Sequence, residues 1–272
     1  MVNLTKKLLE AKDWVKVRAS TDAQQSFLTW KGSVYSFIPG EPKQHLFQIV
    51  GMSVARCIPK PEGGWDFTSR ELTFYLDPET GEKLDTWKNP WTDEVLPVVL
   101  VANNPVQGLF SRSMPALVDE ELTTYKFDLF TSYPNPLAND PKFAEYSPQP
   151  IYQAGELFKL TVPTADLQNP DTTSVSKVML AWDRIGPWLP WMKMGDRSGN
   201  LIYSAWGGKV ANVGELPQII QDEINTRVPL FKNAAKSLLD KDDVTSWIYF
   251  KQHFDAYLQG EKFPLYQPED GL

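Results

Sequence analysis

The sequence predicts a mainly β fold of the α+β class: an antiparallel β-barrel or strongly curved sheet with an N-terminal helix and C-terminal helices packed on it. Runs rich in aromatic and β-branched residues alternate with turn residues along most of the chain. A sheet of many short-linked strands tends to curl or close, because closure removes its exposed edges. At 272 residues the chain exceeds a typical domain, but closed sheets of about 250 residues form single units. We therefore expect one structural domain.

The clearest strand signal surrounds the turn Asp77–Gly81. Its proline fixes φ and its glycine accepts a positive φ, so the segment predicts an antiparallel hairpin between Trp65–Asp77 and Glu82–Trp87. The remaining strands follow from alternation of period two. We expect them at Phe27–Phe37, Leu46–Ile58, Val95–Val101, Leu122–Thr131, Ile151–Val162, Val175–Ile185 and Leu201–Trp206, with turn residues such as Asn103-Asn104-Pro105 between them.

Helical spacing occurs at both ends of the chain. Leu4, Leu8, Ala11 and Val15 predict a short amphipathic N-terminal helix. Two further helices are expected at Leu216–Ile224 and Asp242–Gln259. The expected organisation is an N-terminal helical segment (1–25), an antiparallel β-barrel (26–210) and C-terminal helices packed on the barrel (211–272).

Composition restricts the class of partner. A net charge of −7 argues against nucleic acid, because phosphate binding requires a basic face. No apolar run reaches the roughly 18–20 residues that a membrane span requires, so we expect no membrane insertion. The single cysteine, Cys57, excludes an internal disulfide and fits a reducing compartment. We expect a soluble cytoplasmic protein, and a homodimer remains open.

The tryptophan content points to a ligand. The chain has 10 Trp, more indole than packing requires. Trp182, Trp188 and Trp191 lie in or beside a proline-stiffened loop and can present flat apolar faces, which suits the rim of a pocket for a hydrophobic small molecule. The alternative is that these indoles seal one end of the barrel core.

The strand before this loop carries the first catalytic candidate. Alternation places Trp182 and Arg184 on one face and Asp183 on the other. If Asp183 points inward among apolar neighbours, burial would raise its carboxyl pKa and make it a general acid or base. The alternative pairs Asp183 with an arginine such as Arg56 or Arg70 inside the sheet.

Two adjacent charges on the Trp65–Asp77 strand are further candidates. Arg70 and Glu71 occupy opposite faces, so one of them points inward if one face is buried. An interior arginine offers a fork for a carboxylate or enolate oxygen, and an interior glutamate offers a proton acceptor. The alternative is a solvated face with surface ion pairs. Tyr75, on the Glu71 face, and Arg56 are expected to bind ligand.

The last candidates are Tyr203, which would handle protons or oxyanions, and His253. His253 follows Tyr249 by one helical turn and would act as a proton shuttle if the final helix plugs the barrel. Its alternative role is an exposed helical histidine. No glycine-rich nucleotide motif, phosphate loop or paired Cys/His spacing occurs, so we expect neither a cofactor nor a metal.

Several motifs resemble a known family. Thr73–Gly81, Trp87–Thr92 and Asn104–Val106 look like the signature of the uncharacterised domain-of-unknown-function family 1838, and Trp182–Gly195 is similar to that family too. The resemblance extends from about residue 27 to residue 258. It implies a soluble single-domain protein, and it carries no reaction and no catalytic residues.

Together these observations favour a cofactor-independent enzyme that binds a hydrophobic small molecule in the barrel and catalyses isomerisation, cyclisation or elimination by acid/base chemistry. A non-catalytic carrier of a lipophilic metabolite is the alternative, and a scaffold with exposed tryptophans is a third reading. An enzyme predicts a desolvated titratable group in the cavity, a carrier predicts an apolar lining, and a scaffold predicts a filled barrel. The catalytic candidates are Asp183, Glu71, Arg70, Tyr203 and His253, and the ligand-binding candidates are Trp182, Arg184, Trp188, Trp191, Arg56 and Tyr75.

Overall fold

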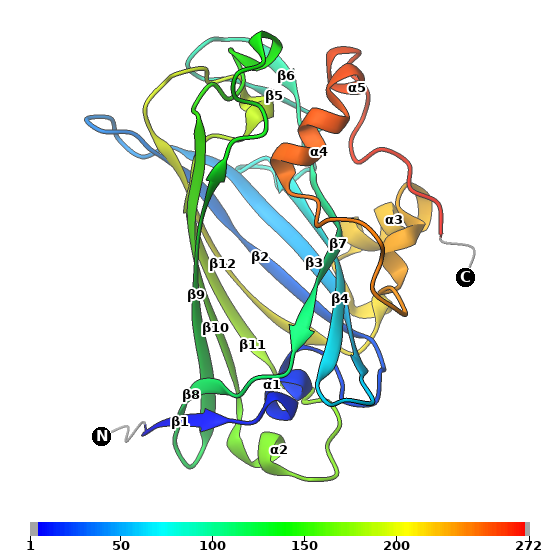
Figure 1. The fold of residues 1–272 in the computed structure, drawn as a ribbon. Helices are drawn as coiled ribbons and strands as arrows, with labels where there is room; N and C mark the ends of the chain where they lie inside the picture. The colour runs from blue at the N-terminus through cyan, green and yellow to red at the C-terminus, as the bar shows by residue number, and fades with distance from the viewer. Residues whose placement is uncertain (1–4, 270–272) are drawn as a thin grey trace.

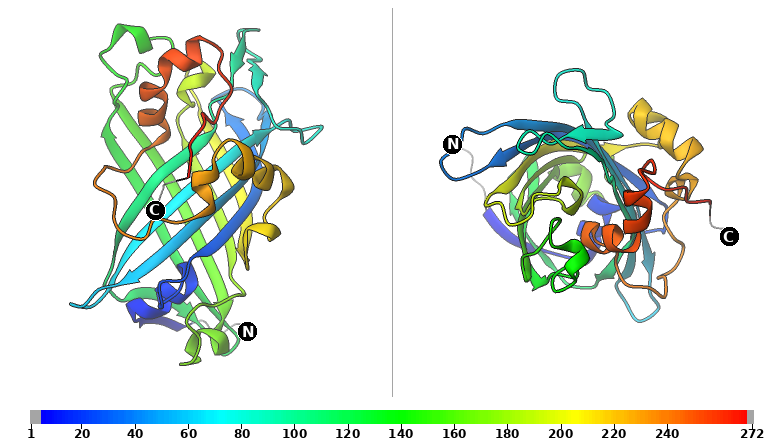
Figure 2. Two further views of the ribbon diagram at one scale, coloured as in Figure 1. Left: turned by 90° about the vertical axis from the view of Figure 1, so that its right-hand side faces the viewer. Right: turned by 90° about the horizontal axis from the view of Figure 1, so that it is seen from above.

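Ten strands form one antiparallel sheet that curls strongly on itself in the computed structural model, which describes residues 5–269 (Figure 1, Figure 2). The expected mainly β fold is confirmed. In sheet order the strands are β1 (Thr5–Leu9), β8 (Met114–Val118), β9 (Leu122–Pro134), β10 (Ile151–Pro163), β11 (Met179–Gly186), β12 (Asn200–Val210), β2 (Ser26–Phe37), β3 (His45–Pro59), β4 (Trp65–Leu76) and β7 (Val101–Phe110). The order begins at β1 and ends at β7, so these two strands are the edges of the curled sheet.

The helices lie at the two ends of the sheet and on its outside (Figure 1, Figure 2). At the lower end in Figure 1 are α1 (Ala11–Arg18) and α2 (Thr164–Gln168), at the upper end are α4 (Ser246–Gln252) and α5 (Phe254–Leu258), and α3 (Gln218–Thr226) lies outside the sheet. The remaining elements are the short strands β5 (Thr86–Lys88) and β6 (Val95–Pro97) and the 3-10 helices η1 (Pro141–Phe143), η2 (Pro190–Met192), η3 (Val213–Glu215) and η4 (Pro229–Lys232). Between residues 5 and 269, every helix is too short or too polar to cross a bilayer.

The predicted turn after β4 forms, but its second strand does not join the sheet. Asp77 accepts two backbone N–H hydrogen bonds within the turn, at 2.9 and 2.8 Å, and Gly81 has a φ of +73°. The returning chain makes a single antiparallel bridge, Leu76 to Lys83, and then departs. Beyond that bridge β4 pairs with β7, and β5 pairs with β6. The hairpin over Glu82–Trp87 was therefore wrong beyond its turn.

The expected N-terminal helix is partly a strand. Residues Thr5–Leu9 form β1, which pairs with β8, and α1 begins only at Ala11. Leu8 is 71% exposed, so its helical spacing with Ala11 does not reflect a buried helical face. Edge pairing with β8 instead supplies the backbone hydrogen bonds of this segment. Leu4 lies outside the described residues.

A predicted turn lies inside β7. Asn104 and Pro105 stand opposite the single residue Arg70, because the register shifts between Ser69 and Glu71. A bulge accepts proline, which has no N–H to give to the ladder. Most of edge strand β7 was therefore missed, because its turn-like composition predicts a loop.

The C-terminal helices agree with the sequence in place but not in length. The helix expected at Leu216–Ile224 is α3. The helix expected at Asp242–Gln259 is two helices, α4 and α5, separated at His253. It begins later than predicted because the Thr245 hydroxyl accepts the N–H of Ile248 at 3.3 Å and caps α4.

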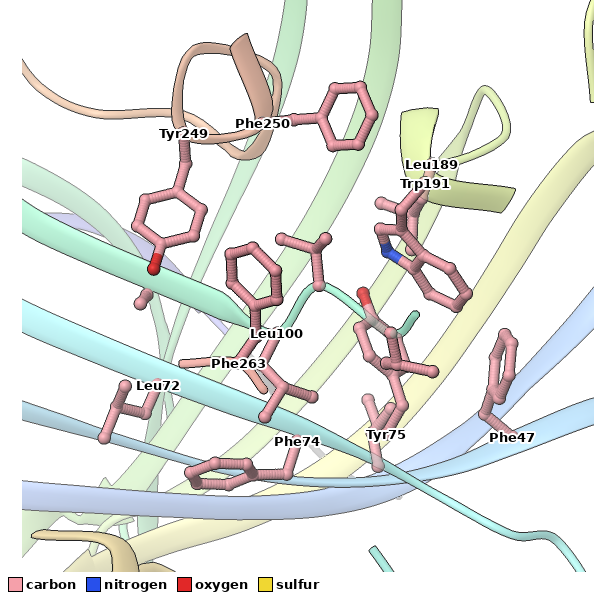
Figure 3. Close-up of a cluster of buried hydrophobic side chains, with 14 of the residues drawn as sticks. Phe47, Leu72, Phe74, Tyr75, Leu100, Leu189, Trp191, Tyr249, Phe250 and Phe263 are labelled. Carbon is pink, nitrogen blue, oxygen red and sulfur yellow. The ribbon is translucent and has the colours of Figure 1, made fainter. Parts of the chain in front are cut away.

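Two aromatic cores fill the ends of the curled sheet. In the lower core Trp14 of α1 packs 5.2 Å from Tyr125 and 5.5 Å from Phe127, between ring centroids. Figure 3 shows Trp191 near Tyr75 and Phe47 in the upper core. Between ring centroids, Trp191 lies 5.6 Å from Tyr75 and 5.8 Å from Phe47.

Candidate functional site

Between the two cores lies a band of inward-facing side chains that solvent reaches. Strand pairing places Leu129 opposite Glu156, and Glu156 opposite Arg184, on the inner face. Leu129 exposes 46% of its surface although it points inward, and the Glu156 side chain exposes 23%. We call this band the inner layer and define it as Glu71, Asn103, Leu129, Glu156, Phe158, Trp182 and Arg184.

Two inward-facing residues below the inner layer and two above it are buried. Below it, Tyr125 and Leu160 expose 0% and 2%. Above it, Tyr203 and Tyr75 expose 3% and 1%. The interior is therefore packed at both ends and accessible in the middle, close to Trp182.

Glu71 is the carboxyl group of the inner layer with the most perturbed environment. Burial raises its pKa above the ordinary value; Glu156 raises it further, whereas Arg18 and a hydrogen bond with Asn103 oppose the shift. The Ser69 hydroxyl also donates to Glu71 Oε1, at 3.5 Å. Glu71 thus favours its protonated form more than an exposed glutamate does, and solvent still reaches its side chain. A carboxyl group with a raised pKa on an accessible surface is suited to proton transfer.

Arg184 and Glu156 form the second polar group of the inner layer. Arg184 Nε lies 3.8 Å from Glu156 Oε1, and the Trp182 indole N–H donates to Glu156 Oε2 at 2.9 Å. The guanidinium lies over the Tyr203 ring, 4.9 Å from its centroid, and donates to the Tyr152 hydroxyl at 3.1 Å. Contacts with Glu156, Tyr203 and Tyr152 therefore hold the Arg184 side chain in one orientation.

Gly186 makes the room for this guanidinium. A Cβ atom on Gly186 would lie 2.7 Å from Arg184 Nη2 and 2.8 Å from its Cζ. No side chain larger than hydrogen fits there without moving Arg184.

Two tyrosines border the inner layer from above. The hydroxyls of Tyr75 and Tyr203 are 3.3 Å apart, and burial raises the pKa of both phenols. Both are therefore neutral at physiological pH and can act as hydrogen-bond donors.

The structure brings five of the sequence-derived candidates together: Glu71, Tyr75, Trp182, Arg184 and Tyr203 lie in or beside the inner layer. Asp183 is not among them. Its side chain points to the outer face of β11, where it accepts a hydrogen bond from the Ser204 hydroxyl at 2.8 Å. The inward orientation on which its acid/base role depended does not occur.

Both arginines proposed as partners for Asp183 hold other segments of chain. Arg70 is 3% exposed on the outer face of β4 and donates to the carbonyls of Leu230 and Asn233. Arg56 donates to the carbonyl of Ala23 and to the Gln25 side chain.

The remaining candidates lie toward the upper end. Trp191 is in the upper core. Trp188 packs edge-on against Trp91 with 5.3 Å between ring centroids, and its indole N–H donates to the carbonyl of Arg197. These two indoles therefore follow the alternative in which they seal the core. His253 separates α4 from α5, and burial lowers its pKa.

Sequence reasoning missed Glu156, Asn103 and Arg18. Glu156 alternates with Ala154 and Phe158 on β10, so period two alone places it with the inward apolar residues. Asn103 was assigned to a turn, and Arg18 lies on a helix whose position in the interior no local pattern reveals.

A groove of about 680 Å³ lies on the outer face, between strands β12, β2 and β3 and the start of α3. Trp206, Lys31 and Ile219 line it, and Trp206 is 58% exposed. Within the part of the chain that the structure describes, Lys31 is the one ionisable side chain that lines this groove. The groove therefore offers less chemistry than the inner layer. Among residues 5–269, no three His, Cys, Asp or Glu side chains gather as a metal site.

Comparison with known proteins gives a family and no activity. The family model described as "Protein of unknown function (DUF1838)" matches residues 23–254, which is most of the chain. No curated protein matches the sequence.

Proposed function

The chain belongs to the DUF1838 family, and we propose that it is an enzyme that binds a small molecule with an apolar body in the inner layer. Glu71 moves a proton during isomerisation, cyclisation or elimination of that molecule. The observation that carries this proposal is a carboxyl group with a raised pKa on a solvent-accessible interior surface.

The surroundings of Glu71 supply the other functions that such a reaction needs. Trp182 and Phe158 lie with 6.3 Å between ring centroids and 21° between their planes, and they offer a flat apolar wall for the substrate. The Arg184 guanidinium can stabilise an oxyanion that forms when Glu71 removes a proton. Glu71 then returns the proton at another atom or passes it to the leaving group.

A carrier of a lipophilic metabolite is the second candidate, favoured by the apolar side chains of Leu129, Phe158 and Trp182. A carrier needs only this wall, whereas an enzyme also needs the proton on Glu71. Glu71→Gln separates the two, because glutamine keeps the size of the side chain and cannot exchange a proton.

The test incubates the wild type, Glu71→Gln and Glu79→Gln with a small-molecule extract in D₂O, followed by mass spectrometry of the extract. Glu79 is an exposed residue of the turn after β4 and serves as the matched control. We expect the wild type and Glu79→Gln to consume one compound and form a product that carries solvent deuterium. Glu71→Gln should bind that compound without converting it. Equal conversion by Glu71→Gln would refute the role of Glu71, and binding without conversion by every variant would favour the carrier.

A further inference from the structure

Arg184 carries a buried hydrogen-bond donor without an acceptor. Its side chain is 9% exposed, and its Nη1 has no hydrogen-bond partner among residues 5–269. The Nη2 atom donates to Tyr152, while Nε lies 3.8 Å from Glu156, beyond hydrogen-bond distance. Buried donors are normally satisfied, and leaving one unsatisfied destabilises the protein, more so for a charged group. The guanidinium therefore fits an additional acceptor from outside the protein.

The charges around the inner layer favour an anionic acceptor. Arg184 Nε lies 3.8 Å from Glu156 Oε1, and Glu156 Oε2 already accepts the Trp182 indole N–H at 2.9 Å. The carboxylate beside Arg184 is therefore shared with a second donor, and Arg184 Nη1 is left without an acceptor among residues 5–269. A buried cation with an unsatisfied donor favours a small anion, although the whole chain has a net charge of −7.

The rest of the inner layer limits the remainder of the ligand to apolar groups. Leu129 stands opposite Glu156 on the inner face and exposes 46% of its surface. Phe127 and Phe158 stack with 4.8 Å between ring centroids, and Phe158 continues to Trp182. A hydrocarbon chain or ring against this wall removes apolar surface from water on both partners.

We propose that the inner layer binds an apolar carboxylic acid, with its carboxylate on the Arg184 guanidinium and its hydrocarbon part against Leu129, Phe158 and Trp182. The proposal rests on the proposed function for the location of the site and adds the chemical class of the ligand. A carboxylate suits the site because its two oxygens match the planar fork of an arginine. An ester or a neutral alcohol of the same shape contacts the apolar wall but brings no negative charge to the Arg184 guanidinium.

The test measures binding of a panel of acids and their methyl esters, from phenylacetate to dodecanoate, by calorimetry. We expect the wild type to bind at least one acid of the panel about 10-fold or more tightly than its ester. Arg184→Met should lose this preference and bind both members of the pair as the wild type binds the ester. Arg112→Met, at an exposed arginine, is the matched control and should behave as the wild type does.

Gly186→Ala covers the case in which Arg184→Met does not fold, because it displaces the guanidinium without removing it. It should lower the affinity for the acid and spare the ester. The proposal is overturned if no acid of the panel binds more tightly than its ester, or if the preference survives both Arg184→Met and Gly186→Ala. Loss of turnover in Glu71→Gln has no bearing on this preference, so the ligand class and the catalytic role fail separately.

Discussion

Arg70→Met should destabilise the protein strongly, because Arg70 fastens the C-terminal part of the chain to the outer face of the sheet. The guanidinium donates to Asn104 Oδ1 at 3.0 Å and to the carbonyls of Leu230 at 3.0 Å and Asn233 at 2.6 Å. Each hydrogen bond from a charged donor contributes about 1.5 kcal/mol or more. Three of them sum to about 4.5 kcal/mol, and the cost of burying the charge, which methionine avoids, reduces the net loss to about 3–4 kcal/mol.

Thermal unfolding followed by circular dichroism measures this loss. A protein of this size loses about 2–4 °C of Tm for each kcal/mol, so Arg70→Met should lower Tm by roughly 6–16 °C. Arg112→Met is the control at an exposed position and should change Tm little. An Arg70→Met protein that keeps its Tm but loses ligand binding would refute the structural role and return Arg70 to the binding site.

Two further variants follow from the inner layer. The pKa of Glu71 in the folded state is raised above its ordinary value of 4.5. Between these two pKa values the folded state holds a proton that the unfolded state has released. The free energy of unfolding of the wild type therefore falls as pH rises from 4.5 through the folded pKa. Glu71→Gln should therefore unfold at a higher urea concentration than the wild type at pH 8 and at the same concentration at pH 4.5. A difference in urea midpoint that does not change with pH would contradict the raised pKa of Glu71. Gly186→Ala should displace the Arg184 guanidinium and break its hydrogen bond to Tyr152, which contributes about 1.5 kcal/mol. A Tm equal to that of the wild type would show that the guanidinium tolerates a methyl group at position 186.

Strand alternation made most of the architecture predictable. It located the long strands and separated Glu71 from Arg70, and Arg184 from Asp183, onto opposite faces, because side chains of a strand alternate with period two whatever the strand packs against. It did not decide which face points inward. It failed for β1 and β7, whose sequences resemble a helix and a turn. Both are edge strands, and pairing on one side is decided by the neighbouring strand rather than by local preference.

The height of each inward-facing residue within the curled sheet was not predictable from the sequence. Trp182 and Trp191 are similar indoles in one segment, yet Trp182 faces the accessible inner layer and Trp191 lies in the upper core. The difference depends on which height of the curled sheet each residue reaches, and therefore on register between distant strands. For the same reason the sequence could not show that Glu156 lies beside Arg184, 28 residues later in the chain.

Native mass spectrometry of the protein purified without added ligand compares the wild type with two tryptophan substitutions. Leu129→Trp fills the inner layer, and Leu157→Trp places the same side chain on the outer face of the adjacent strand β10. We expect a small-molecule adduct on the wild type and on Leu157→Trp, and none on Leu129→Trp, with all three proteins folded. A wild type without an adduct, or an adduct of equal amount on Leu129→Trp, would contradict the view that the inner layer holds the ligand.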